Sequence, residues 1–270
     1  MVLIRNFQKK SDVFVFDSER EGKSSYYDSR HLKGLTQIED RHFWFTSRRE
    51  KICRTIQSHV SKSARILDVG GGTGFIAAKV KQLGFSIEVG DICSGAFPLA
   101  RQRGIDHLYQ FDLFNPPFEE EFDAVCLFDV LEHFPDPLNA IECVKKMLRL
   151  KGLLILTVPA HGWLWSREDR VAGHERRYNK AQLKELLQDS GLQLIEVRYF
   201  FLSLIPFLLL RKWIKRDDGS ALNPDEVFNP KVVPIINNFL SALIRIEFFL
   251  ERFLPNCMGG SLIAVGIRTQ

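Results

Sequence analysis

The sequence lacks the cysteine and histidine patterns that mark metal-binding or disulfide-rich proteins. It has five cysteines in 270 residues, but no Cys-x-x-Cys pair and no Cys/His spacing suited to zinc. We therefore expect reduced thiols in a cytoplasmic protein and no bound metal. The net charge of +4 is small and scattered, which disfavours a nucleic-acid partner because such a partner requires a clustered basic face.

Long apolar runs and internal repeats are also missing. No run reaches the roughly 20 residues of a membrane-spanning helix, and the short, polar segment before residue 10 does not resemble a cleavable signal. Apolar residues nevertheless make up 45% of the chain, enough for a sizeable core. The composition therefore fits one large domain, or a domain with an elaboration.

A glycine-rich turn follows a short apolar run near residue 70. The segment Arg65-Ile-Leu-Asp-Val-Gly-Gly-Gly-Thr-Gly-Phe75 predicts a buried strand that ends in an acid and turns into a helix, as in a nucleotide-binding βαβ unit. The third glycine of a dinucleotide fingerprint would fall on Phe75, and the Gly-Lys-Ser/Thr ending of a phosphate-binding loop is missing. Asp68 would repel a phosphate but attract an ammonium group.

Asp68-x-Gly70-x-Gly72-x-Gly74 resembles motif I of the class I S-adenosylmethionine (SAM)-dependent methyltransferases. The run His-Phe-Trp-Phe-x-x-Arg48, the turn Asp-Val-Leu-Glu-His133 and the strand Lys-Gly-Leu-Leu-Ile155 also resemble this family, in its small-molecule, ubiquinone-pathway-like branch. The resemblance covers residues 38–200 and the last strand.

Strand and helix patterns alternate from the glycine turn onward, which predicts a doubly wound parallel α/β sheet. The family implies a Rossmann-like sheet of seven strands, mostly parallel, with the last strand antiparallel at the edge and helices on both faces. We divide the chain into an irregular N-terminal arm or cap (1–37), the SAM-binding core (38–200), a helical insertion (201–258) and the final core strand (259–270).

The insertion is apolar and then basic, which leaves three interpretations open. It could be a helical subdomain that caps the substrate, a homodimer interface, or a peripheral membrane contact through residues 200–216. In the last case Arg211, Lys212, Lys215 and Arg216 would face lipid headgroups.

Acidic residues follow several predicted strands, at the edge where ligands bind such sheets. Asp91, 17 positions after Gly74, suits the ribose hydroxyls of SAM. By resemblance, Asp112 meets the adenine amino group and Arg48 pairs with the SAM carboxylate, although a surface arginine is the alternative. The predicted cofactor-binding residues are Arg48, Asp68, Gly70, Gly71, Gly72, Gly74, Asp91, Ile92, Asp112, Leu113, Phe128 and Asp129.

The loop 161–178 leaves the same edge and is dense in polar side chains, although a solvated loop is the alternative. His174 is the best candidate general base, because histidine titrates near neutrality. His133 is the second candidate, with a structural turn role as its alternative. Gly-His-x-Arg-Arg-Tyr178 resembles a signature of bacterial methyltransferases associated with cell-surface glycan or lipid pathways. The predicted acceptor-binding residues are Trp44, Trp165, Arg176, Arg177 and Tyr178.

The resemblance implies transfer of a methyl group from SAM to a small-molecule acceptor, with S-adenosylhomocysteine as product. We predict an oxygen nucleophile on a lipid- or sugar-linked molecule, in a cytoplasmic or membrane-peripheral enzyme. The alternatives are N- or carboxyl-methylation by the same fold, and a non-catalytic SAM-binding protein that acts as an interaction partner. Phe75 argues against a NAD-dependent dehydrogenase.

Overall fold

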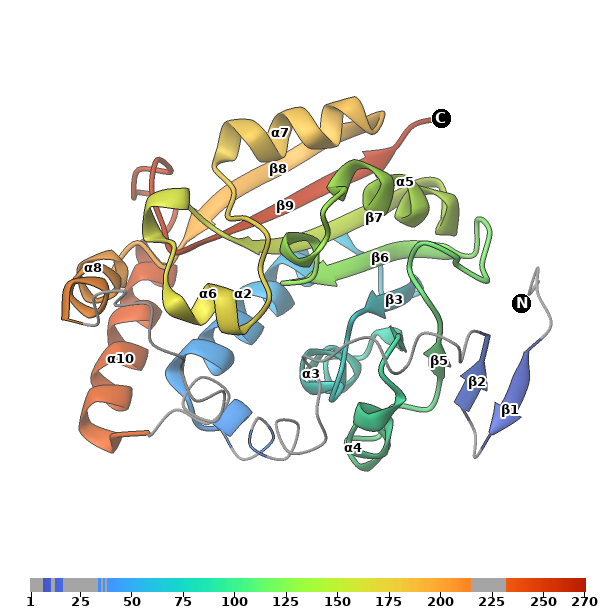
Figure 1. Ribbon diagram of the computed structural model, residues 1–270, viewed down its shortest axis with the longest axis horizontal. Helices are drawn as coiled ribbons and strands as arrows, with labels where there is room; N and C mark the ends of the chain where they lie inside the picture. The colour runs from blue at the N-terminus through green and yellow to red at the C-terminus, as the bar shows by residue number, and fades with distance from the viewer. Residues whose placement is uncertain (1–6, 11–12, 17–33, 35, 37, 215–231) are drawn as a thin grey trace.

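The computed structural model describes residues 7–10, 13–16, 34, 36, 38–214 and 232–270. Within these residues a nine-stranded sheet has the order β1-β2-β5-β4-β3-β6-β7-β9-β8 (Figure 1). Strands β2 to β7 are mutually parallel where they pair, and β9 is antiparallel to both β7 and β8. The strands are β1 Gln8–Lys10, β2 Val13–Val15, β3 Arg65–Val69, β4 Ser86–Asp91, β5 Leu108–Gln110, β6 Phe122–Phe128, β7 Leu148–Pro159, β8 Leu192–Phe200 and β9 Ser261–Arg268.

The predicted doubly wound α/β core is confirmed by seven strands that lie side by side in the order β5-β4-β3-β6-β7-β9-β8. The edge strand of this core differs from the prediction. The last strand, β9, pairs on both sides, so β8 is the edge strand. The reason is visible in the burial pattern. The first six residues of β9 are all buried, as an interior strand requires, whereas β8 has exposed positions along its length.

The sheet also has two strands more than predicted, because part of the N-terminal arm is not irregular. Strand β2 pairs in parallel with β5, and β1 pairs with β2. Phe14 on β2 stacks on Tyr109 of β5, with ring centroids 5.3 Å apart. This contact shows why a run of β-branched and aromatic residues extends the sheet here.

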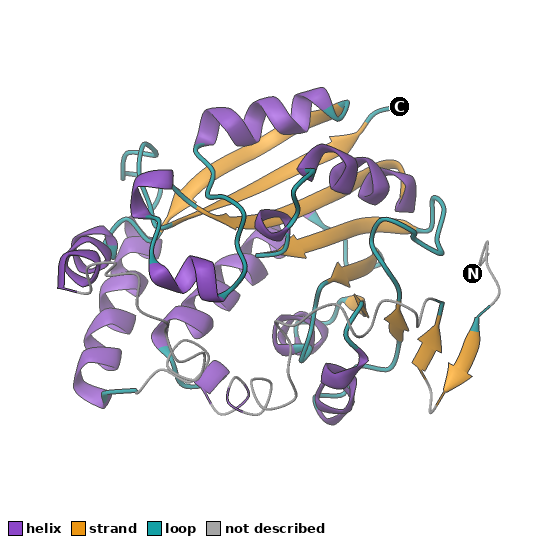
Figure 2. Ribbon diagram, in the orientation of Figure 1, coloured by secondary structure: helices purple, strands orange, loops and turns teal. Residues whose placement is uncertain are grey.

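Helices cover both faces of the sheet (Figure 2). One apolar layer joins α2, α3, α4 and α10 to side chains such as Ile66, and the other joins α5 and α7 to side chains such as Leu67. Successive residues of β3 thus enter opposite layers, as the strand period of two requires. The helices are α2 Phe43–His59, α3 Phe75–Gln82, α4 Phe97–Gln102, α5 Pro137–Met147, α6 Arg167–Val171, α7 Lys180–Asp189, α8 Ile205–Ile214 and α10 Pro234–Leu250, with 3-10 turns η1 Ser94–Ala96, η2 Leu131–His133 and η3 Gly162–Leu164.

The insertion between β8 and β9 contributes α8 and α10, which lie together at one side of the molecule, with α10 against α2 (Figure 1). Glu247 of α10 is buried and accepts hydrogen bonds from the backbone N–H groups of Leu202 (2.9 Å) and Ser203 (2.8 Å). This carboxylate fixes α10 to the segment that leads into α8. Lys215 and Arg216 lie outside the described residues. None of the helices in the described ranges has the length and apolar character needed to cross a membrane.

Candidate functional site

A cavity of about 1190 Å³ lies beyond the C-terminal ends of β3, β6 and β7. Its wall includes the glycine loop, the first half of α2, turn η2, the loop and helix α6 after β7, and the apolar side chains of α8. Pockets for one small molecule usually measure about 300–1000 Å³. The cavity therefore has room for a cofactor together with a second molecule.

The glycine loop presents bare backbone to this cavity. At Gly70 (φ +73°) an added Cβ would lie 2.6 Å from Val130 Cγ2, so only glycine fits. At Gly72 (φ +50°), apart from the adjoining residues, the only atom of the described residues within 4 Å of an added Cβ would be Asp91 Oδ2, at 4.0 Å. A side chain at Gly72 would thus occupy the space in which a ligand can approach the loop.

Asp68 gives this end of the cavity a buried acidic group. Its side chain is buried at the end of β3, and among the described residues Oδ1 has no hydrogen-bond partner. Burial raises the pKa of Asp68 to about 7, while the nearby Arg48 guanidinium lowers it and Asp91 raises it. A buried carboxyl group of this kind is suited to a cation, and the predicted contact of Asp68 with the ammonium group of SAM stays a prediction.

The predicted ribose and adenine ligands, Asp91 and Asp112, are not among the residues that line the cavity. Asp91 Oδ2 accepts a hydrogen bond from Gly72 N (2.9 Å) and Asp91 Oδ1 from Cys93 N (2.8 Å). The Asp91 carboxylate therefore shapes the glycine loop. Asp112 Oδ1 accepts a hydrogen bond from Phe114 N (3.0 Å). The roles of these two acids in SAM binding stay predictions, as do those of the residues that follow them, Ile92 and Leu113.

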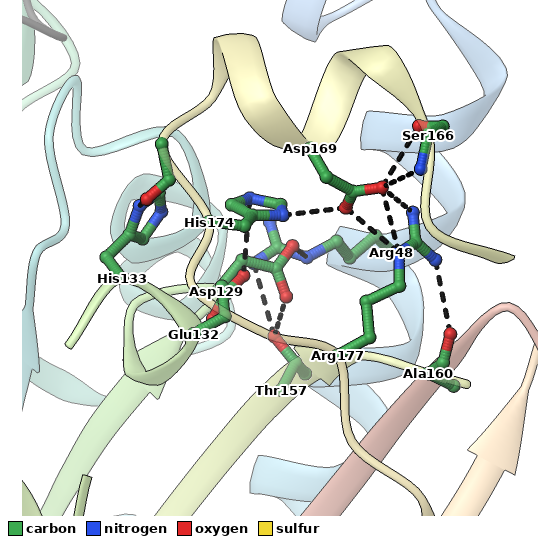
Figure 3. A network of polar contacts seen from close by, with 11 residues as sticks. Arg48, Asp129, Glu132, His133, Thr157, Ala160, Ser166, Asp169, His174 and Arg177 are labelled. Carbon is green, nitrogen blue, oxygen red and sulfur yellow. Dashed lines mark hydrogen bonds and ion pairs between the residues drawn. The ribbon is translucent and has the colours of Figure 1, made fainter. Parts of the chain in front are cut away.

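Arg48 lines the cavity within an ion-paired triad (Figure 3). Its Nε lies 2.7 Å from Asp129 Oδ2, and Nη2 donates to Thr157 Oγ1 (3.2 Å). The Thr157 hydroxyl in turn donates to Asp129 Oδ1 (2.9 Å). Phe128, the last residue of β6, also lines the cavity. The triad holds the guanidinium at the cavity wall, and the predicted pairing of Arg48 with the SAM carboxylate stays a prediction.

His174 also lines the cavity, and a buried carboxylate holds its side chain (Figure 3). Its Nδ1 lies 2.8 Å from Asp169 Oδ1, and its Nε2 lies 3.8 Å from Glu132 Oε1. Arg177 Nε donates to Asp169 Oδ1 (2.9 Å), and Ser166 N donates to Asp169 Oδ2 (2.8 Å). Burial alone would raise the pKa of Asp169, but the hydrogen bonds from His174 and Arg177 outweigh it and hold the pKa at about 2.

The ionised Asp169 determines which nitrogen of His174 carries the proton. A carboxylate can only accept hydrogen bonds, so Nδ1 of a neutral His174 must be the donor. Nε2 then holds a lone pair, and the side chain lines the cavity. This is the arrangement that a general base needs.

Glu132 completes the cavity floor and was not among the predicted site residues. It is fully buried, and neither carboxylate oxygen has a hydrogen-bond partner in the described part of the chain. Burial raises its pKa well above the usual range, and the charge of Asp129 adds to this shift. Asp169 was also missed, although Ser166-x-x-Asp169 is a capping-box pattern that could have drawn attention to it.

His133 lies beside His174, with ring centroids 4.9 Å apart, and its Nδ1 is 3.2 Å from the Gly173 carbonyl oxygen. Burial lowers the pKa of His133, and the charge of His174 lowers it further. Ligand-type atoms of Glu132, His133 and His174 lie within 4.8 Å of one another. These three side chains could therefore surround one metal ion, although the sequence predicted no metal.

The five predicted acceptor-binding residues fall into two groups. Trp44, Trp165 and Arg177 line the cavity. The Arg177 guanidinium, however, pairs with Asp169 and donates a hydrogen bond to the Ala160 carbonyl oxygen (3.2 Å). Arg177 therefore orients the loop 161–178.

The structure places Arg176 and Tyr178 outside the cavity lining. Arg176 Nη2 donates to the Pro135 carbonyl oxygen (2.8 Å). The Tyr178 side chain is buried in the apolar layer of α5 and α7. Neither residue is among those that line the cavity, and their predicted contact with the acceptor stays a prediction.

Comparison with known proteins identifies the family. Residues 44–197, more than half of the chain, match a family model described as a methyltransferase domain. The ubiquinone biosynthesis O-methyltransferase of Xanthomonas oryzae pv. oryzae is 32% identical over 101 residues, which cover 35% of this chain and 42% of that protein. The match thus spans about two fifths of the relative's length.

Two solved structures share the fold. Phosphoethanolamine N-methyltransferase 2 of Haemonchus contortus, in complex with SAM, has a TM-score of 0.61 at 16% identity over 94% of this chain and 60% of that one. A Haloferax volcanii complex of a methyltransferase with the activator Trm112 gives 0.59 at 16% identity, over 91% and 96%. The chain therefore belongs to the methyltransferase domain family.

Proposed function

We propose that this enzyme methylates a hydroxyl oxygen of a small-molecule acceptor and that His174 is the general base. The observation that carries the proposal is the Asp169–His174 pair at the cavity wall, with Nδ1 held at 2.8 Å. The likeness to an O-methyltransferase from Xanthomonas oryzae supports oxygen as the target. The cavity lies at the C-terminal ends of the parallel strands, which is where doubly wound folds bind their ligands. This position supports a reaction site in the cavity.

The residues divide the chemistry between two walls. SAM supplies a methyl group on a positively charged sulfur, which already activates that methyl group. Asp68 and the glycine loop are the residues suited to hold its amino-acid part. His174 Nε2 accepts the hydroxyl proton while the acceptor oxygen takes the methyl group, and Asp169 stabilises the resulting imidazolium. The electron pair of the broken carbon–sulfur bond stays on sulfur, in S-adenosylhomocysteine.

The walls around His174 indicate an acceptor with both a polar and an apolar part. Glu132 and His174 form a polar floor, while Trp44, Phe207 and Leu208 contribute apolar surface to the same cavity. Such a lining aligns a mostly apolar molecule by a few polar contacts and excludes water from the reaction.

Turnover by a His174→Ala variant tests the proposal. Radiolabelled SAM is incubated with the enzyme and a lipid extract of the source cells, and transfer of the methyl label is measured. General-base catalysis contributes about 10²–10⁴-fold, so we expect a loss of at least a hundredfold, with SAM affinity unchanged in calorimetry. The methyl label in the product should resist mild alkali, as an ether does and an ester does not.

His107→Ala is the matched control, because His107 is an exposed histidine outside the cavity. Full turnover by the His174 variant, with normal SAM binding, would refute the assignment of the base. A methylated product that mild alkali cleaves would show that the acceptor group is a carboxyl group and not a hydroxyl group. Either result leaves the family assignment intact.

A further inference from the structure

Helices α8 and α10 carry an exposed apolar surface that the fold does not use. We define the α8–α10 face by Leu209, Leu210 and Trp213 on α8 and by Ile235, Phe239 and Phe249 on α10. Trp213 is 74% exposed, Ile235 82% and Phe249 80%. Phe207 of α8 contacts Phe239 of α10, with ring centroids 6.4 Å apart, so the surface continues from one helix to the other.

Helix α10 has two apolar stripes, one that packs on the core and one that is exposed. Leu240, Ile244 and Phe248 are buried in the apolar layer that includes α2. A helix with one such stripe normally turns polar residues outward. On α10 the outward side instead repeats apolar residues at three- and four-residue spacing from Ile235 to Phe249, and Phe253, just beyond the helix, continues the repeat. Contiguous apolar surface of this kind marks an interaction site.

The exposed charges of the two helices are basic in the described range. They belong to Arg211 and Lys212 at the end of α8 and to Arg245 on α10, and Arg252 follows just beyond α10. Glu168 of α6 pairs with Arg211 and so neutralises part of this positive charge. A rim of Lys and Arg around an apolar face, with tryptophan at its border, suits the headgroups of anionic lipids.

A second copy of the chain suits the face less well. A helical seam between two copies is normally flanked by charges of both signs that pair across it. On α10 the acids are unavailable for such pairing, because Glu247 is buried against Ser203 and Glu251 just beyond the helix pairs with Lys51. Arg245 and Arg252 would therefore face like charges in many such pairings.

The face also continues into the cavity. Leu209, Leu210 and Trp213 are exposed and at the same time line the cavity whose floor carries His174. An amphipathic molecule could therefore pass from a bilayer into the cavity along α8 without crossing water. Its polar end would reach the floor while its apolar chain remained against the leucines.

We propose that the α8–α10 face docks on an anionic bilayer surface and that the enzyme takes an amphipathic acceptor from that bilayer through the adjoining cavity mouth. The source of the acceptor rests on the proposed function, whereas the docking does not. The contact is interfacial, because the apolar side chains belong to helices that lie on the folded core.

Sedimentation of the full chain with vesicles tests the docking. One set is phosphatidylcholine alone and the other contains about 30% phosphatidylglycerol, enough to attract juxtaposed basic residues. We expect tighter binding to the anionic vesicles. Trp213→Ser combined with Phe249→Ser should weaken that binding by roughly tenfold or more, because two large apolar side chains no longer enter the interface. Arg245→Glu with Arg252→Glu should weaken binding to the anionic vesicles alone.

Leu150→Ser with Ile195→Ser is the matched control, since these side chains are 59% and 47% exposed and lie outside the face. All variants should bind SAM as the parent protein does, which shows that they fold. Equal binding to both vesicle types would refute the preference for an anionic bilayer. Unchanged binding of the Trp213/Phe249 variant would refute the α8–α10 face as the docking surface. A dimer that this variant dissociates, without vesicle binding, would assign the face to a second copy. A His174→Ala enzyme should still bind vesicles, so this test and that of the proposed function fail separately.

Discussion

Asp68 should make SAM binding depend on pH in a range where few carboxyl groups titrate. Burial raises its pKa to about 7, against the opposing effect of Arg48. Near pH 7 about half of the free enzyme therefore carries a neutral Asp68, and near pH 6 about nine tenths does. A cation bound beside the carboxyl group favours its ionised form, so binding must expel a proton in this range.

The sign and size of the effect follow from this pKa. Affinity is full above about pH 7 and falls as the pH drops, because protonation removes the charge that attracts the ammonium group. Each pH unit below 7 should weaken binding by about tenfold, or about 1.4 kcal/mol, until the pKa of the bound form is reached. Above about pH 8 the amino group of SAM itself loses its proton, so affinity should be greatest between these limits.

Calorimetry with S-adenosylhomocysteine, at about pH 6 and about pH 7.5, measures the effect. Two buffers of different protonation enthalpy count the proton that is released. Asp68→Asn should abolish both the release and the acid limb of the profile. At the higher pH it should weaken binding roughly ten- to a hundredfold, the contribution of one hydrogen bond to a charged group. A parent profile that is flat from pH 6 to pH 7.5, or an Asn variant with the same acid limb, would refute the role of Asp68.

Three further perturbations test the site by different measurements. Asp169→Asn should lower turnover roughly a hundredfold or more and leave SAM affinity unchanged, because Nδ1 of His174 loses its anionic partner. Gly70→Ala should lower the free energy of unfolding in urea by about 3 kcal/mol, since both its positive φ and a contact at 2.6 Å oppose a side chain. Gly104→Ala, with a positive φ in open space, should cost about 1 kcal/mol. Added Zn²⁺ should inhibit turnover by occupying Nε2 of His174, EDTA should reverse this, and Glu132→Gln should weaken the inhibition.

The glycine-loop half of the candidate site could be predicted from the sequence because it is built from local structure, while its contacts with SAM stay predictions. The glycine loop needs positive φ angles within a few residues of a strand end, and Asp68 stands at the end of β3. The glycines and the acid that meet these requirements lie within a few consecutive residues, so the sequence shows them directly. The assignment of Asp91 shows the limit of such reasoning: the acid is at the end of β4 as expected, but its oxygens accept hydrogen bonds from Gly72 N and Cys93 N.

The acceptor half could be predicted only in part, because contacts between distant segments determine its side-chain directions. The loop that carries His174 is fixed to turn η2 by a hydrogen bond from Glu175 N to Glu132 O (2.8 Å). Residue types alone placed Arg176 and Arg177 together. The structure separates them, because Arg176 donates to the Pro135 carbonyl oxygen whereas Arg177 pairs with Asp169.

The turn after β6 links the two halves and gives a physical reason for the motif Asp129-Val-Leu-Glu132-His133. Asp129 adopts a left-handed conformation (φ +55°), which an aspartate tolerates better than most residues, and its carboxylate meets Arg48 on the cofactor side. The chain then enters the 3-10 turn η2, which directs Glu132 and His133 toward His174. A shift of this turn would therefore move the Arg48 pair and the cavity floor together. Alignment of donor and acceptor is the main catalytic task of such an enzyme, and one short turn connects the groups to which we assign that task in the proposed function.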